Sequence, residues 1–243
     1  MTGKGSLNHN SRKFHAKNTD PNRTHWNVEY CNEDIKDVYH ELFDEALKRY
    51  NDKQTRKDRK IDDYYEKIRS GKQEKLFHEV IIQIGDKDNM GSETMEGQLA
   101  AKILDEYMKG FQERNPALRV FAAHLHMDET TPHLHVDFVP YTTGSKRGLD
   151  TRVSLKQALS ALGFKGGTRI ETELNQWVAA EKQQLASIML DHGIEWEQKG
   201  THEKHLSLLD FEKQERAKEV AALEEQKADL EEHNATMQEV NEK

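Results

Sequence analysis

The stretch "LRVFAAHLHMDETTPHLHVDFVPY", residues 118–141, decides the fold because it predicts two neighbouring β-strands. Residues 118–127 and 132–141 are mostly apolar and carry β-branched and aromatic side chains, which is typical of strands. Only "DETT" separates them, and so short a connection indicates a hairpin-like antiparallel pair.

Histidines follow the alternation of these two strands. Residues two apart point to the same face of a strand, so His124 and His126 share one face, as do His133 and His135. If the strands pair, His126 comes beside His133 and His135. Three imidazoles with an open coordination position are typical of a catalytic metal site.

The turn between the strands adds Asp128 and Glu129, as a further ligand or as partners that orient a histidine. Histidine in a strand is more often a surface or hydrogen-bonded residue, but three histidines around one turn favour a metal. Imidazole suits zinc, manganese, nickel and iron alike, so the ligands do not name the ion. The helical HExxH motif is absent, and one cysteine excludes a cysteine-based zinc site.

The rest of the chain predicts helices and one further strand. Residues 1–33 are polar and predict a loop with a turn at Asp20-Pro21. From Asp34 apolar side chains recur every three or four residues, which indicates a helix. Further predicted elements are a strand at 76–85, a loop at 86–94, a helix at 95–116, a loop with Lys146 and Arg147, and helices near 152–162 and 171–192.

Composition narrows the class of protein. The 243 residues are 35% hydrophobic and 33% charged, with a mean hydropathy of −0.97, so part of the chain is expected to be an exposed helix or disordered. No apolar run is long enough to cross a membrane. The N-terminus has no apolar signal segment. The one cysteine, Cys31, fits a reducing compartment, and we expect a cytoplasmic protein.

Charge is unevenly distributed along the chain. The net charge is −8, but residues 210–243 hold 11 acids and 5 bases, which leaves −2 for residues 1–209. Residues 48–75 hold 11 bases against 6 acids, a local charge of +5. Local fields decide polyanion binding, so the global charge does not exclude DNA. A solvated face with ion pairs is the simpler interpretation of such a stretch.

The tail differs from the preceding chain. We expect a domain at 1–205 and the start of a charged helical or coiled-coil region at 206–243. A heptad seam is formed by Val220, Leu223, Leu230 and Met237, with Lys227 and Asn234 at the intervening a positions. A single solvated helix is the alternative. The pattern stops at Lys243 in mid-repeat, so we expect the native protein to continue.

A second polar cluster, "NHNSRKFH" at 8–15, lies near the N-terminus. An imidazole such as that of His9 can attack phosphorus, and a guanidinium such as that of Arg12 can hold phosphate oxygens in a bidentate contact. A divalent ion with an open face can polarise a phosphodiester. A flexible polar N-terminus looks much the same, so the cluster alone decides little.

Together, "NHNSRKFHAKNTDPNRTHWNVEY" (8–30) and "AHLHMDETTPHLHVDFVP" (123–140) resemble the MobV relaxases. These are the Pre/Mob plasmid mobilisation and recombination enzymes, a branch of the HUH endonucleases. The first stretch is similar to the family's His-Asn-x-Arg box and the second to its His-x-Asp-Glu-x-x-Pro-His-x-His box. The likeness covers roughly residues 6–200.

The resemblance implies an α+β fold, an antiparallel β-sheet flanked by helices, with a C-terminal helical extension. It implies a relaxase that nicks one DNA strand at an origin of transfer and stays covalently joined to the 5′ end. His126, His133 and His135 would bind Mn²⁺ or Mg²⁺. The implied partners are single- and double-stranded origin DNA, a second copy through the C-terminal helical region, and the conjugation machinery.

The resemblance also assigns roles to the remaining site residues. It implies that His9 is the nucleophile, that Arg12 holds phosphate or orients His9, and that Glu129 is an acid or base near His9 and the metal. Family members often have a strand before the first box, whereas only "MTGKG" precedes that region here. This leaves the placement of His9 open.

Two other functions remain as alternatives. A replication initiator or single-strand transposase usually needs a tyrosine on a helix after the histidine pair, and only Tyr141, at a strand end, follows His135. A DNA-binding or interaction protein with a structural metal would bind zinc tightly, would not nick DNA and would unfold on chelation. If His9 is not the nucleophile, the tyrosines near basic residues are the candidates: Tyr30, Tyr64 and Tyr65.

Overall fold

The structure is a computed structural model. It describes residues 2–3 and 6–197, together with residues 213, 216–217, 220–221, 223–224, 226–227 and 230. The chain divides into two compact units, Met1–Trp196 and Glu197–Lys243. The expected domain boundary at 205/206 stays a prediction.

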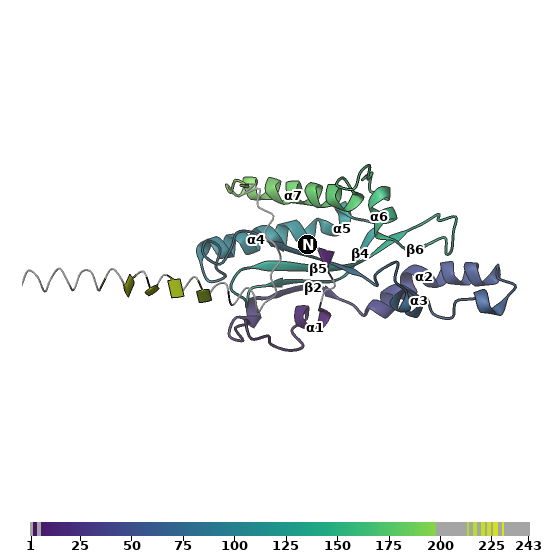
Figure 1. The fold of residues 1–243 in the computed structure, drawn as a ribbon, viewed down its shortest axis with the longest axis horizontal. Coiled ribbons are helices and arrows are strands. Elements are labelled where there is room, and N and C mark those ends of the chain that lie inside the picture. Colours follow the sequence, from purple (N-terminus) through teal and green to yellow (C-terminus); the bar gives the residue numbers. More distant parts are fainter. Residues whose placement is uncertain are drawn as a thin grey trace, which may run out of the picture. The chain divides into compact units, whose positions relative to one another are not determined.

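A six-stranded antiparallel sheet forms the centre of the first unit, in the order β1-β3-β5-β4-β2, with β6 paired to β5 (Figure 1). The hairpin-like pair of the sequence is the middle of this sheet. The strands are β1 (Thr2–Gly3), β2 (Val28–Asn32), β3 (His78–Gln83), β4 (Leu118–His126), β5 (His133–Thr142) and β6 (Arg152–Val153).

Helices cover both faces of the sheet, and Figure 1 shows α4 to α7 on one side and α1 to α3 on the other. The prediction of an α+β fold with an antiparallel sheet flanked by helices is therefore confirmed. The helices are α1 (Leu7–Asn10), α2 (Ile35–Asp52), α3 (Tyr64–Ser70), α4 (Met95–Lys109), α5 (Phe111–Arg114), α6 (Leu155–Ala161) and α7 (Glu173–Asp191), with short 3₁₀ turns at Thr24–Trp26 and Lys57–Arg59.

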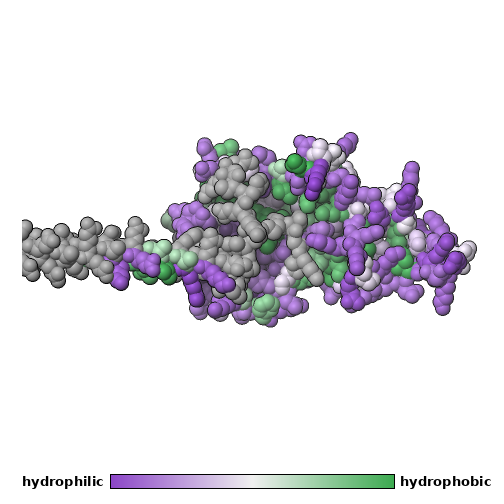
Figure 2. All heavy atoms as spheres, in the orientation of Figure 1, coloured by the Kyte–Doolittle hydropathy of each residue, from purple (hydrophilic) through white to green (hydrophobic). Residues whose placement is uncertain are grey.

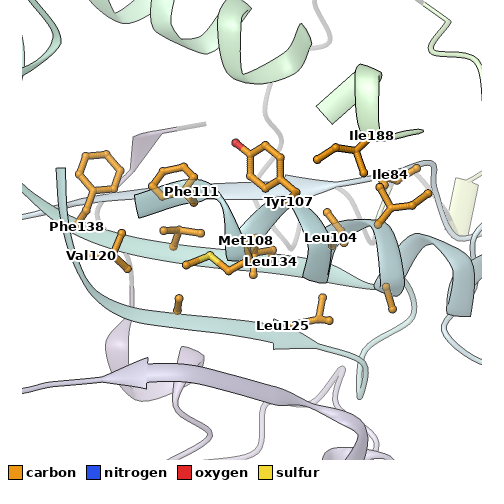
Figure 3. Packing of buried hydrophobic residues seen from close by; sticks show 14 of the residues in the cluster. Ile84, Leu104, Tyr107, Met108, Phe111, Val120, Leu125, Leu134, Phe138 and Ile188 are labelled. Atoms are coloured by element: carbon orange, nitrogen blue, oxygen red, sulfur yellow. The ribbon is translucent and has the colours of Figure 1, made fainter. Parts of the chain in front are cut away.

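Two hydrophobic clusters pack on opposite faces of the sheet. The larger lies under α4, α6 and α7, where Leu134 and Phe138 of β5 meet Leu104 and Phe111 (Figure 3). The smaller joins α2 and α3 to the other face, where Phe43 meets neighbours that include Phe121 and Val139. The smaller cluster covers one end of this sheet face. The histidines lie at the other end of the same face, which is covered by α1 and the loops beside it.

The N-terminal region differs from its prediction as a loop. Val28–Asn32 forms edge strand β2 and pairs with β4 across a register shift. Its side chains are half-buried or exposed, so no apolar run marks it in the sequence. A short strand also precedes the first box, because Thr2 and Gly3 pair with Val80 and Glu79. An upstream strand, which the short N-terminal sequence left in question, is thus present as two residues.

Two predicted helices have different bounds. The helix expected at 95–116 is interrupted at Gly110, which caps α4 and precedes the single turn of α5. The helix expected near 152–162 begins at Leu155, because Arg152 and Val153 pair with β5 and Ser154 caps the helix.

Only scattered residues of the second unit are described, and apart from Glu197 they are helical. Val220, Leu223 and Leu230 are each more than half exposed. Met237 and Asn234 lie outside the residues that the structure describes, so the heptad prediction stays a prediction. In the described part of the chain, no helix is both long enough and apolar enough to cross a membrane.

Candidate metal and nucleophile site

Strand pairing brings the four histidines of the hairpin onto one face. His126 lies opposite His133, and His124 lies opposite His135. The ring centroids of His126, His133 and His135 are 4.6 to 5.2 Å apart. His124 stays outside this triangle, with its Nε2 3.2 Å from Glu29 at the strand edge. The three predicted ligands therefore converge, as strand alternation indicated.

Each of these three rings has one nitrogen bound to a protein acceptor. His126 Nε2 lies 2.8 Å from the carbonyl oxygen of Asn10, and His133 Nδ1 lies 2.8 Å from that of Thr131. A carbonyl oxygen only accepts, so these two nitrogens carry the protons. His135 Nδ1 donates to Glu79 Oε1 at 2.7 Å. The remaining nitrogen of each ring therefore carries a lone pair.

A metal ligand needs a free ring nitrogen that faces the site, so the surroundings of these nitrogens show whether the site fits a metal. His126 Nδ1 and His135 Nε2 are buried and have no hydrogen-bond partner among the described residues. His133 Nε2 lies 3.8 Å from Glu129 Oε1, as does His126 Nδ1. Metal-bound histidines usually donate their other nitrogen to a carboxylate or carbonyl, which is the pattern here. The donor set fits a divalent ion.

Donor atoms lie close enough for coordination in two overlapping sets. One is His9, His126 and His135, and the other is His126, Glu129 and His133; the donors within each set lie within 4.8 Å of one another. His126 belongs to both. The second set places Glu129 among the donors, a position that the turn sequence had left open between ligand and orienting partner.

The surroundings of His126 and His133 favour their neutral forms. Burial is the largest cause, and together with the charge of Arg12 it lowers the pKa of His126 to about 2. Burial and the charge of His135 likewise lower the pKa of His133. Neutral imidazole is the form that binds metal, so the rings are ready as ligands near neutral pH.

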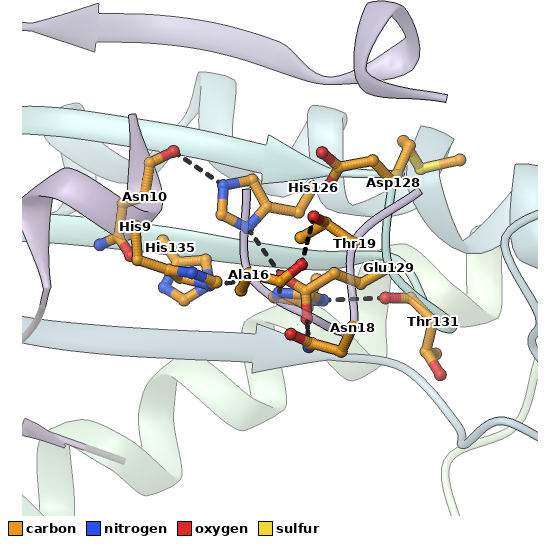
Figure 4. A network of polar contacts seen from close by, with 12 residues as sticks. His9, Asn10, Ala16, Asn18, Thr19, His126, Asp128, Glu129, Thr131 and His135 are labelled. Carbon is orange, nitrogen blue, oxygen red and sulfur yellow. Dashed lines mark hydrogen bonds and ion pairs between the residues drawn. The ribbon is translucent and has the colours of Figure 1, made fainter. Parts of the chain in front are cut away.

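Helix α1 brings His9 to this cluster from the start of the chain. Its ring centroid lies 5.7 Å from that of His126 and 6.0 Å from that of His135. His9 Nε2 lies 3.3 Å from Glu129 Oε1. Figure 4 shows the His9 side chain extended from α1 toward the histidines of the sheet. The two boxes of the sequence thus meet in one site.

Arg12 fixes the end of α1. Its φ of 52° is the left-handed conformation, unusual for a residue with a side chain. The guanidinium donates to both carboxylate oxygens of Asp128, to Glu129 Oε1 at 2.8 Å and to the carbonyl oxygen of His9 at 3.1 Å. Arg12 is therefore bound to the turn that carries Asp128 and Glu129 and holds the backbone of His9.

Glu129 is held as a carboxylate. Burial alone raises its pKa, but the hydrogen bonds from His9 and Arg12 and the positive charge of Arg12 outweigh it and lower the pKa to about 2. Asn18 donates to its other oxygen at 2.6 Å. One oxygen of Glu129 thus faces His9, Arg12 and two ligand histidines.

Three residues that bind the site histidines were not predicted from the sequence patterns. Asn10, Glu79 and Thr131 each accept from a site histidine, and Glu79 comes from a strand predicted only as structural. Asn10 stands inside the first box, which marked its neighbourhood but not its role.

The candidate tyrosines are engaged elsewhere. Tyr30 donates to Asp105 at 2.9 Å, Tyr141 donates to the carbonyl oxygen of Pro116 at 3.2 Å, and the Tyr64 oxygen accepts from the backbone of Val153 at 3.2 Å. Tyr65 lies on α3, its ring packed against that of Tyr39. None of these contacts involves a site histidine.

Known proteins share this arrangement of strands and helices. The structure resembles the MobM relaxase domain (MOBV; Mob_Pre) in Mn-bound crystal structures with 22-nucleotide oriT DNA of plasmid pMV158. One, at pH 5.5, has a TM-score of 0.50 and 24% identity, covering 85% of this chain and 90% of that one. Another, with a 3′-thiophosphate at pH 6.8, has the same TM-score and identity and covers 85% and 89%. At this identity the likeness concerns the fold.

Sequence comparison decides the family. No curated protein sequence matches the chain. The model of the Mob_Pre family, described as plasmid recombination enzyme, matches residues 6–213, which include both boxes and the whole sheet from β2 to β6. The chain therefore belongs to the Mob_Pre family of plasmid recombination enzymes.

Proposed function

We propose that this protein is a metal-dependent relaxase that nicks one strand at a plasmid origin of transfer and stays joined to the 5′ end. One observation carries the proposal: an imidazole from α1, His9, lies beside His126 and His135, whose free nitrogens are buried and have no hydrogen-bond partner among the described residues. Family membership and the fold shared with an oriT-bound relaxase support it.

In the proposed reaction, a ring nitrogen of His9 attacks the phosphorus of the scissile phosphodiester. A P–N bond forms, the P–O3′ bond breaks, and the 3′ oxygen leaves and takes up a proton as a 3′-hydroxyl. Glu129, held as a carboxylate 3.3 Å from His9 Nε2, stabilises the positive charge that develops on the ring and accepts the proton that the ring gives up. Arg12 orients His9 through its backbone carbonyl.

His126, His133 and His135 would hold Mn²⁺ or Mg²⁺, with Glu129 within reach as a fourth group. The bound ion supplies electrostatic stabilisation for the charge that develops on the phosphate oxygens. The protein's contribution is to orient each ring by bonding one of its nitrogens and to bury the other nitrogen of His126 and of His135.

The proposal extends to partners and compartment. Single-stranded origin DNA would reach the histidine end of the sheet face, and the basic stretch 48–75 would contact its backbone. A second copy through the C-terminal region, the conjugation machinery and a cytoplasmic location remain parts of this proposal.

Covalent capture tests the nucleophile. Labelled single strands tiled across the DNA beside the protein's own coding sequence are incubated with protein and Mn²⁺. We expect a protein–DNA adduct that is labile in acid, as a P–N bond is, and no adduct with His9→Ala. His15→Ala is the matched control, because His15 is an exposed histidine of the same segment.

Two outcomes would overturn the proposal in different ways. An acid-stable adduct that persists in His9→Ala would move the nucleophile to a tyrosine. No adduct with any tile, together with tight zinc binding and unfolding by EDTA, would indicate a structural-metal protein instead.

A further inference from the structure

Asn10, the residue after His9, is the last residue of α1 and lies buried against the sheet. It is 2% exposed. Its carbonyl oxygen accepts from His126 Nε2 at 2.8 Å, and its side-chain Nδ2 donates to Glu79 Oε1 at 2.8 Å and to Asp137 Oδ2 at 2.9 Å. A single residue of α1 therefore contacts β3, β4 and β5, and Figure 4 shows its link to the His126 ring.

These contacts determine which nitrogen of two histidines carries the proton. The carbonyl of Asn10 holds the proton on His126 Nε2 and leaves Nδ1 as the free donor. Glu79 Oε1, held in place by the Asn10 amide, accepts from His135 Nδ1 at 2.7 Å and leaves Nε2 as the free donor. A metal can bind only the unprotonated nitrogen, so the tautomer decides whether a ring is a ligand.

We propose that Asn10 is a positioning residue that docks the helix bearing His9 and, by the same contacts, fixes the metal-binding tautomers of His126 and His135. The proposal rests on the proposed function, in which these histidines bind a divalent ion and His9 attacks DNA. It deepens that function, because the contacts that place His9 in the site are the same contacts that set the metal-binding nitrogens of His126 and His135.

The chemistry of the cavity explains why the residue is an asparagine. Glu79 is 6% exposed and Asp137 is 0% exposed, so water has little access to either carboxyl group. An amide nitrogen has two protons and can donate to both groups at once. Aspartate has the same shape but would bring a third carboxyl group against these two; ionised it has no donor, and protonated it has one proton where the amide has two.

The test compares Asn10→Asp with Asn8→Asp, which adds the same charge at an exposed position of the same helix. Mn²⁺ affinity is measured by titration calorimetry without DNA. Long-range ¹H–¹⁵N spectra of the metal-free protein report the tautomer of each imidazole. We expect Asn10→Asp to bind Mn²⁺ at least about tenfold more weakly, the usual effect of losing an outer contact. We also expect its His126 and His135 rings to show mixed tautomers, while Asn8→Asp matches the wild type.

Other results would overturn the role of Asn10, or would overturn the proposed relaxase function alone. Wild-type tautomers and affinity in Asn10→Asp would overturn it. If that variant does not fold, Asn10→Ala removes the same side-chain amide without adding a charge, and wild-type tautomers and affinity there would equally overturn it. Predicted tautomers and Mn²⁺ binding without any DNA adduct would sink the proposed function and leave the role of Asn10 intact.

Discussion

At the scale of single residues, the site depends on which atoms are already occupied. Arg12 has the donors to grip a phosphate, but its guanidinium is bound to Asp128, Glu129 and the backbone of His9. Of the two roles that the resemblance implied, the geometry supports orientation of His9. A phosphate would have to displace a buried ion pair to reach the guanidinium.

Arg12→Lys tests how much this ion pair contributes. The guanidinium bonds both carboxylate oxygens of Asp128 and one oxygen of Glu129, and the single ammonium of lysine cannot make all three contacts. Asp128 is 0% exposed, so water cannot replace the lost contacts. We expect the free energy of unfolding in urea, measured with EDTA present, to fall by about 3 kcal/mol because a buried carboxylate loses its partner.

Arg49→Lys is the control for this prediction. Arg49 makes a similar two-pronged contact with Asp150, but on the surface. Exposed ion pairs contribute little, so its replacement should leave the unfolding midpoint unchanged. Equal losses from the two variants would show that burial is not what makes the Arg12 contact matter.

The sequence predicted part of this residue-level picture. Alternation along two strands was enough to place His126, His133 and His135 together, because a strand's side-chain period is fixed. The tautomers could not be predicted, since they depend on contacts with Asn10 and Glu79, which are 116 and 56 residues away along the chain.

At the scale of elements, a largely buried carboxylate of α7, Glu181, is a polar contact of that helix with the rest of its layer. Glu181 accepts from Arg114 at 3.1 Å and from Asn115 at 2.9 Å, and Tyr107 donates to it as well. Asn115 in turn accepts from the indole of Trp177 at 2.7 Å. This network joins α4, α5 and α7 above the larger hydrophobic cluster.

Glu181→Leu should destabilise the fold by about 3 kcal/mol, because the partners that donate to Glu181 lose their acceptor inside the protein. Thermal and urea unfolding of the metal-free protein measure the loss. Glu106→Leu is the counterpart, because Glu106 also joins α4 to the end of α7, through His192, but is 53% exposed. Its effect should stay within about 0.5 kcal/mol, and a comparable loss there would contradict the argument.

Helices and strands could be predicted where apolar residues recur at a regular spacing or form a continuous run. The central strands and the helices α2, α4 and α7 have such marks. Strand β2 has none, because it is a short edge strand with exposed or half-buried side chains, and its pairing with β4 is decided by tertiary contacts. The break at Gly110, which caps both α4 and α5, has no mark in the apolar pattern of residues 95–116.

At the scale of the first unit, one sheet face has two uses. The histidines occupy one end of it, and α2 and α3 pack on the other. Hydrophilic side chains dominate the surface around these two helices (Figure 2). The connection between them carries Lys57, Arg59 and Lys60, all exposed. The basic stretch is thus on the same side of the sheet as the site.

DNA binding should reflect that arrangement. Replacing Lys57 and Lys60 by glutamine removes two charges near the proposed path of the strand. We expect the slope of log Kd against log salt, measured by fluorescence anisotropy with single-stranded DNA, to fall by about 1.4, since each phosphate contact contributes about 0.7.

Lys102→Gln with Lys182→Gln removes two charges from α4 and α7, which cover the opposite face. This pair should leave the salt slope unchanged. The same drop in slope for both pairs would show that net charge, and not the position of the basic stretch, governs binding.

The docking of α1 also has a consequence for the order in which the protein is made. The amide of Asn10 reaches Asp137, 127 residues further along the chain. The segment with His9 is synthesised first, yet it has nowhere to bind until β5 has been translated. A nascent chain therefore carries the proposed nucleophile without a site, and we expect the ability to cut DNA to arise only once the hairpin has left the ribosome.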